Sequence, residues 1–151
     1  MKTSVRPSVP LVKHAHTRLQ SVERRAILYA YKRTRHMRKI EQQMIEAIKE
    51  SRNWKSGNTS VCYSADYDTS RVYLHNNLIA IVSDTDVEVF DGGWQSNTTK
   101  SRLNAICNAF CIDGEGIFQK DFQWFVHKFV GQAGTSKVYN KEEFVNGYVF
   151  G

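Results

Sequence analysis

Residues 59–90 read TSVCYSADYDTSRVYLHNNLIAIVSDTDVEVF, and this stretch decides the fold. Polar and apolar residues alternate along much of it with a period of two, which is typical of strands that bury one face. Asp66-Tyr67-Asp68 and Asp84-Thr85-Asp86 mark turns, and Asn76-Asn77 suits the positive-φ positions of a tight hairpin. The stretch therefore predicts an antiparallel meander of four strands, at residues 59–64, 71–75, 78–82 and 87–90.

A short helix and further strands follow the meander. Thr98 or Thr99 is the expected N-cap of the helix, and one apolar face at helical spacing comprises Leu103, Ile106, Cys107 and Phe110. Later strands are expected at residues 117–118, 122–126, 138–139 and 148–150. The fold class is α+β, with a long basic N-terminal helix followed by a small antiparallel sheet of five to seven strands and one short packed helix.

The segment before the meander predicts a long helix. From Thr17 to about Asn53 no Gly or Pro interrupts a run of good helix formers. Arg33 falls where the apolar stripe of residues 22–48 should continue, so the segment is one helix with a polar break or two helices that meet near 32–35. A long helix is stable only if its stripe packs on something. The stripe would pack either on a second copy, giving a homo-oligomer through helix 17–53, or on the chain's own sheet.

The change of pattern near Gly57 divides the chain. Residues 1–16 are expected to be a flexible lead-in, residues 17–55 a basic helical arm, and residues 56–151 a small α+β domain. Since the domain holds nearly all of the strand pattern and the aromatic residues, we expect it to fold without the arm.

Charge changes at the same boundary. Residues 1–55 carry fourteen of the 21 Lys and Arg but four of the 15 acids, a net charge of +10, whereas the remainder is −4. A basic arm on a mildly acidic body favours an anionic partner, and nucleic acid, DNA or RNA, is the commonest one. The alternatives are a solvated basic helix, or an arm that docks on its own acidic body or on that of a neighbour.

The arm supplies the candidate nucleic-acid contacts. Cations would bind phosphate, and Tyr29, Tyr31 and His36 could stack on bases of a single strand. Because no base-reading motif is present, binding should be largely independent of sequence and strongly dependent on salt. The candidate phosphate contacts are Arg24, Arg25, Lys32, Arg33, Arg35, Arg38 and Lys39.

Residues 91–102 form a second candidate, a secondary phosphate seat. A glycine turn, an aromatic ring, a capped helix start and two cations occur together there, and free N–H groups at a helix start attract anions. The alternative is a structural corner in which Trp94 covers the core. The residues of this seat are Trp94, Thr98, Thr99, Lys100 and Arg102.

Local motifs do not indicate catalysis, a cofactor or a metal. Cys107 and Cys111 have the spacing of half a metal site, but the apolar surroundings of Cys107 favour burial without metal. No nucleophile–base pair or phosphate-binding loop is visible, so we expect a non-enzymatic protein without a cofactor. No run of about 18 apolar residues exists, so no membrane contact is expected. Three cysteines without an export signal predict free thiols in a reducing compartment.

Residues from about 58 to 124 resemble a small domain that recurs in uncharacterised proteins of tailed bacteriophages. The residues that carry this resemblance are Val72-Tyr73-Leu74-His75-x-Asn77-x-Ile79-Ala80, Gly92-Gly93-Trp94, Thr98-Thr99-Lys100-Ser101-Arg102-Leu103-Asn104-Ala105-Ile106 and Gly116-Ile117-x-Gln119-Lys120. The resemblance implies a phage origin and a fold, and it carries no catalytic residue. It favours a small accessory protein that acts on nucleic acid or on host machinery in the cytoplasm of the infected cell, as in host takeover. The alternative function is a protein-interaction module that docks on a host or virion protein through the N-terminal helix.

Overall fold

The computed structural model describes residues 37–151, which form two α-helices and nine strands. The helices are α3 (Lys39–Lys49) and α4 (Asn97–Phe110). The strands are β1 (Trp54–Ser56), β2 (Thr59–Ser64), β3 (Thr69–Leu74), β4 (Asn77–Val82), β5 (Val87–Val89), β6 (Gly116–Lys120), β7 (Gln123–Ala133), β8 (Ser136–Glu143) and β9 (Tyr148–Phe150).

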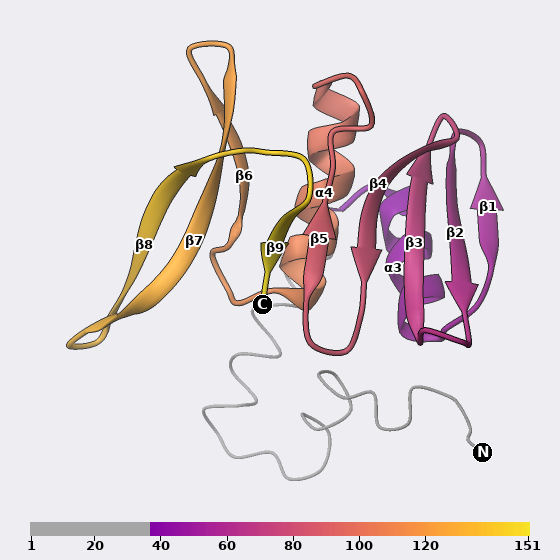
Figure 1. The fold of residues 1–151 in the computed structure, drawn as a ribbon, viewed down its shortest axis with the longest axis horizontal. Helices are drawn as coiled ribbons and strands as arrows, with labels where there is room; N and C mark the ends of the chain where they lie inside the picture. Colours follow the sequence, from indigo (N-terminus) through magenta and orange to yellow (C-terminus); the bar gives the residue numbers. More distant parts are fainter. Residues whose placement is uncertain (1–36) are drawn as a thin grey trace, which may run out of the picture.

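The strands form two antiparallel sheets. The larger sheet has the order β1-β2-β3-β4-β5-β9, and the smaller one has the order β6-β7-β8. Figure 1 shows α4 beside the larger sheet, with the smaller sheet on its other side. The predicted meander is confirmed as β2 to β5, and the fold is α+β. The predicted antiparallel sheet of five to seven strands is confirmed as the six-stranded sheet, and the separate three-stranded sheet is an addition to the prediction.

The hairpin between β3 and β4 turns one residue earlier than predicted. Leu74 pairs with Asn77, so the two loop residues are His75 and Asn76, with φ of 51° and 66°. Asn77 is already the first residue of β4. Two consecutive positive φ values are those of the turn whose twist matches a β-hairpin, so the turn type was predicted and its register was not.

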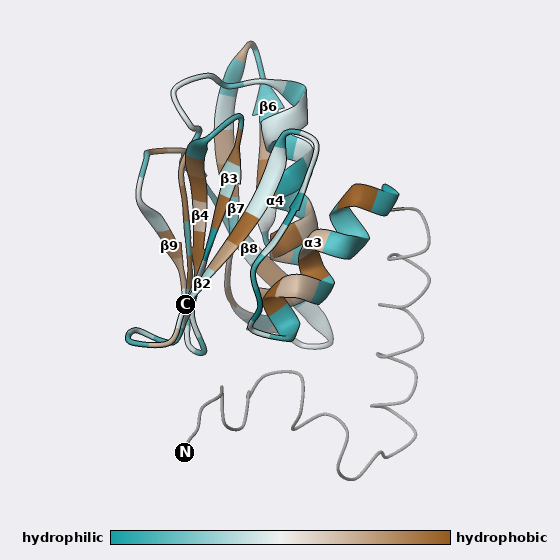
Figure 2. Ribbon diagram, turned by 90° about the vertical axis from the view of Figure 1, so that its right-hand side faces the viewer, coloured by the Kyte–Doolittle hydropathy of each residue, from teal (hydrophilic) through white to brown (hydrophobic). Residues whose placement is uncertain are grey.

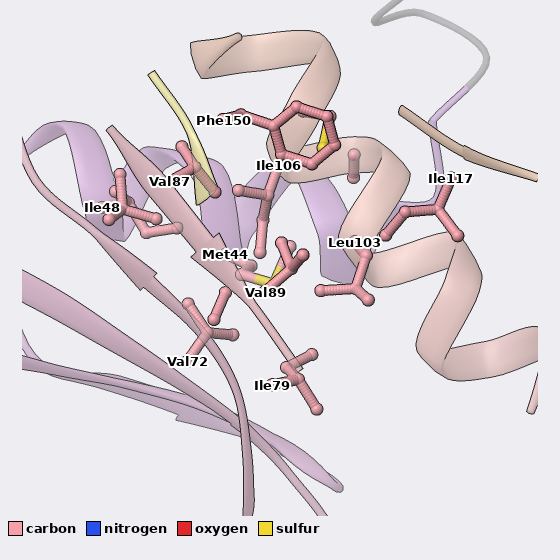
Figure 3. Packing of buried hydrophobic residues seen from close by; sticks show 14 of the residues in the cluster. Met44, Ile48, Val72, Ile79, Val87, Val89, Leu103, Ile106, Ile117 and Phe150 are labelled. Carbon is pink, nitrogen blue, oxygen red and sulfur yellow. The ribbon is translucent and has the colours of Figure 1, made fainter. Parts of the chain in front are cut away.

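Helix α3 packs on its own chain. Met44, Ala47 and Ile48 are fully buried, and they contact a core built from both sheets and from α4 (Figure 3). Figure 2 shows brown hydrophobic residues alternating with teal hydrophilic ones along α3, and the buried residues of α3 are mostly the hydrophobic ones. Residues 37–55, which the sequence assigned to an arm, therefore contribute to the core. The lead-in and the rest of the predicted helix, residues 1–36, lie outside the described residues.

Helix α3 is also shorter than the predicted helix. Arg38 has an extended backbone (φ −63°, ψ 148°) and is the N-cap residue, so the helix begins at Lys39. It ends at Lys49. Two residues later Ser51 has a positive φ of 55°, which turns the chain away from the helix. A break in the segment of residues 17–53 therefore lies at Arg38, and the predicted break near residues 32–35 lies outside the described residues.

A buried ion pair joins the two helices to the sheet. Arg102 Nη1 of α4 donates to Glu41 Oε2 of α3 at 2.7 Å, and the two side chains are only 5% and 4% exposed. Ser101 Oγ donates to the same carboxylate oxygen, and Arg102 Nε donates to Thr59 Oγ1 at the start of β2. Buried charges are tolerated only when they are paired and hydrogen-bonded in this way.

We predict that the ion pair is required for stability. Glu41→Ala should lower the free energy of unfolding by about 3–5 kcal/mol, because it leaves the Arg102 guanidinium buried without its partner. Denaturant unfolding measures this change. The double variant Glu41→Leu/Arg102→Met should recover most of the loss, and a single variant as stable as the wild type would contradict the prediction.

We also predict that the folding unit begins near Met37. A truncation that starts at Met37 should unfold cooperatively, whereas one that starts at Ser56 should lose its fold because α3 supplies buried side chains and the Glu41 carboxylate. Circular dichroism during heating distinguishes the two. A cooperative transition in the shorter chain would restore the boundary expected from the sequence.

Candidate functional site

The structure describes two of the ten candidate nucleic-acid contacts. Arg38 and Lys39 are both exposed at the start of α3. The other eight candidate contacts lie outside the described residues: Arg24, Arg25, Tyr29, Tyr31, Lys32, Arg33, Arg35 and His36.

The predicted secondary seat lies at the N-terminus of α4, and its cap differs from the prediction. Ser96 is the N-cap residue: its Oγ accepts a hydrogen bond from the backbone N–H of Thr99 at 3.1 Å. The Thr99 side chain is buried and lies 2.9 Å from Ser96 Oγ. The prediction of Thr98 or Thr99 as N-cap is therefore wrong, because the helix already begins at Asn97.

A hollow of about 250 Å³ lies against this helix start. Two regions that are distant in sequence build it: the β3–β4 hairpin, and the turn after β5 with the adjoining first turn of α4. The Trp94 side chain is 77% exposed beside the hollow, so it does not cover the core. The lining residues are Leu74, His75, Asn77, Ile79, Asp91, Gly92, Trp94, Ser96, Thr98 and Thr99.

Glycine is required at one point of this wall. Gly92 has a φ of 70°, and a Cβ at this position would lie 3.1 Å from Ile79 Cγ2. The close approach places the turn of residues 91–94 directly on β4. Asp91 fixes the same turn, since its carboxylate accepts hydrogen bonds from the Gly93 backbone at 2.7 Å and from the Gln95 side chain.

The two cations of the predicted seat have different positions. Lys100 is half-buried, and its Nζ donates to Gln119 Oε1 of β6 at 3.1 Å. Arg102 is buried against Glu41 and cannot reach a phosphate at the surface. Arg102 is therefore removed from the seat. Its partner is 61 residues earlier in the chain, and no local pattern reveals such a contact.

The structure adds His75, Asn77 and Asp91 to this site. They give the hollow an imidazole, an amide and a carboxylate beside an exposed indole ring. Such a wall can form hydrogen bonds and stack on a planar group, and both are binding functions. His75 and Asn77 were not predicted to belong to this site, because their place beside Trp94 depends on the strand register.

A second hollow of about 220 Å³ lies between α4 and the smaller sheet. Its buried carboxylate, Glu115, accepts hydrogen bonds from the backbone N–H of Ile112 and of Phe129 and lies 3.3 Å from Lys128 Nζ. These contacts fix the turn before β6 on β7. Glu115 therefore has a structural role.

Cys107 is fully buried at the end of α4. A hydrogen bond with the Cys111 side chain, burial and the nearby charge of Glu115 raise the pKa of the Cys107 thiol well above its usual range. Residues 37–151 contain no group of three or more His, Cys, Asp or Glu side chains that could hold a metal ion. Neither described helix is long and apolar enough to cross a membrane.

We predict that the thiols differ sharply in reactivity. A disulfide reagent at neutral pH should modify Cys62, which is exposed, and should leave Cys107 unmodified until the protein unfolds. Peptide mass mapping after short labelling measures this difference. Labelling of Cys107 in the folded protein at the rate of Cys62 would contradict the burial described here.

Comparison with known proteins extends the resemblance found in the sequence. The model of the family described as Kyanoviridae Gp96 protein matches residues 37–151, the same range that the structure describes and one that includes α3. No curated protein and no solved structure matches the chain. The predicted phage resemblance over residues 58–124 is thus confirmed and is longer than expected. Because the match covers most of the sequence, the chain belongs to the Kyanoviridae Gp96 protein family, a family of phage proteins.

Proposed function

We propose that this phage protein is a non-enzymatic accessory protein that binds nucleic acid, largely without sequence preference, through the basic segment that precedes its domain. The distribution of charge carries the proposal. Residues 1–36 contain nine Lys and Arg and a single acid, Glu23, whereas residues 37–151 contain twelve Lys and Arg and fourteen acids. The boundary of the family match therefore separates a segment of +8 from a domain of −2.

The ion pairs within the domain strengthen this contrast. Arg102 is paired with Glu41, Lys128 with Glu115 and Arg52 with Glu50. Acids of the domain thus neutralise several of its own cations. Arg38 and Lys39, in comparison, are exposed and directly continue the basic segment.

Phosphate neutralisation would supply most of the affinity. Each cation that contacts a phosphate releases counterions, so the binding should weaken steeply with salt. Tyr29, Tyr31 and His36 lie among these cations in sequence and favour a single-stranded target, whose bases are free to stack. Trp94 and the hollow beside it would offer a second contact for the same strand.

Docking on a host or virion protein is the second candidate. The apolar stripe of α3 does not serve it, because that stripe is buried on the chain's own sheet. The supporting observation is the exposure of three aromatic side chains, Tyr67, Trp94 and Phe122, the last of them 95% exposed at the β6–β7 turn. Exposed aromatic residues are common anchors of protein interfaces.

We predict that five cations account for most of the binding. Replacement of Lys32, Arg33, Arg35, Arg38 and Lys39 by Gln should abolish tight binding to single-stranded oligonucleotides. The slope of log affinity against log salt should flatten by up to about 3.5 units on single strands if all five contact phosphate. Fluorescence anisotropy at several salt concentrations measures both quantities.

A matched control removes five exposed cations from the domain instead, by replacement of Lys49, Arg52, Lys55, Arg71 and Lys120 with Gln. Its net charge equals that of the first variant, and its binding should stay close to that of the wild type. An equal loss of binding affinity in both variants would show that only the total charge of the protein matters. Unchanged binding in the first variant would exclude the basic segment and favour protein docking.

A further inference from the structure

We propose that the protein forms a twofold-symmetric dimer through antiparallel pairing of β8 with β8 of a second copy. The dimer would join the two three-stranded sheets into one sheet of six strands. This interface is distinct from the basic segment and does not depend on nucleic-acid binding.

Strand β8 has one unused edge. It pairs with β7 on one side and is the last strand of its sheet on the other. Seven of its eight residues are exposed, with Tyr139 the exception. An exposed strand edge presents a row of backbone N–H and C=O groups that another strand can pair with.

The outer part of the β7–β8 hairpin also lacks a third strand. Strand β6 pairs with Gln123 to His127 of β7, so residues 128–133 pair with β8 alone. Figure 1 shows this ribbon extending away from both helices. An isolated two-stranded ribbon is only marginally stable in water. Two apolar side chains of this ribbon, Val130 and Val138, are also 50% and 40% exposed.

The charges of β8 favour one register of self-pairing. If Asn140 lies opposite Asn140 of the second copy, Lys137 lies opposite Glu143 of the second copy, and the twofold axis repeats this pair. Tyr139 then lies opposite Lys141 of the second copy, which places a cation beside an aromatic ring. Directly opposite side chains of unlike charge stabilise a strand pair, and like charges destabilise it.

The neighbouring symmetric registers are less favourable. The twofold axis keeps each side chain on the same face of the sheet in both copies. The axis must therefore pass beside a residue, and successive symmetric registers differ by moving the axis from one residue to the next. With the axis at Tyr139, Lys137 lies opposite Lys141 of the second copy. With the axis at Lys141, the two Lys141 side chains lie opposite each other. Only the register centred on Asn140 avoids opposed lysines among these three.

The contacts that Lys137 and Glu143 make within one chain leave these two side chains available. Lys137 Nζ is 3.8 Å from Asp113 Oδ2, the outer limit of an ion pair, and both side chains are largely exposed. Glu143 accepts a hydrogen bond from Gln123 at the surface. One strand edge per copy is a small interface, so we expect a weak, reversible and salt-sensitive dimer.

The test is a charge reversal and its compensation, read by sedimentation velocity of the full chain over a range of concentrations. Lys137→Glu and Glu143→Lys should each weaken the dimer by about tenfold or more, since two symmetry-related pairs then carry like charges. The double variant Lys137→Glu/Glu143→Lys should restore the dimer. Lys120→Glu, an equal charge change on β6, should have no effect.

Three results would overturn the proposal: a wild type that stays monomeric at the highest concentration, single variants that associate as tightly as the wild type, or a double variant that does not recover. The second result would place self-association elsewhere in the chain.

A cross-link tests the register independently. In a Cys62→Ser background, Asn140→Cys should form a disulfide-linked dimer under mild oxidation, because the two sulfurs meet at the twofold axis. Gln132→Cys, on the other strand of the same ribbon, should remain monomeric. Equal cross-linking of both variants would count against the interface.

Discussion

The contact between Glu41 and Arg102 is the constraint on which the arrangement of this domain depends. It joins α3, α4 and the first residue of β2, and each of its charges has lost its water. An unpaired charge in this position would be very costly. The ion pair therefore favours one rotation of α3 about its own axis and one position of the helix along the sheet. Glu41 lies three, four and seven residues before Met44, Ile45 and Ile48, so the same rotation buries the apolar stripe.

The sequence predicted the elements whose patterns depend only on residues close together in the chain. Alternation in residues 59–90 defined the meander, and the face of Leu103, Ile106 and Cys107 defined α4, because both patterns are local consequences of side-chain direction. The partner of α3 could not be predicted in this way. Its apolar stripe could pack on a second helix as well as on a sheet. Glu41 interrupts the stripe with a charge, and its partner Arg102 looks in the sequence like an ordinary surface cation.

The candidate site was predicted in part for the same reason. The segment of residues 91–102 contained a visible turn, an aromatic residue and a helix start. The hairpin residues His75 and Asn77 complete the hollow only through the pairing of β3 with β4 and the contact of Gly92 with Ile79. Both are long-range features. Family membership adds a phage origin, and the charge of the chain is what favours an anionic partner.

Strand β9 has a consequence for synthesis of the protein. Phe150 fills the core beneath β5, and its strand pairs with Val87 across a long stretch of intervening chain. Such non-local pairing is completed late in folding. On the ribosome, β9 cannot pair with β5 before Phe150 has emerged, so the core stays incomplete until then. The basic residues that precede α3 emerge before the domain does, so their charge is exposed on the nascent chain while the domain is still incomplete.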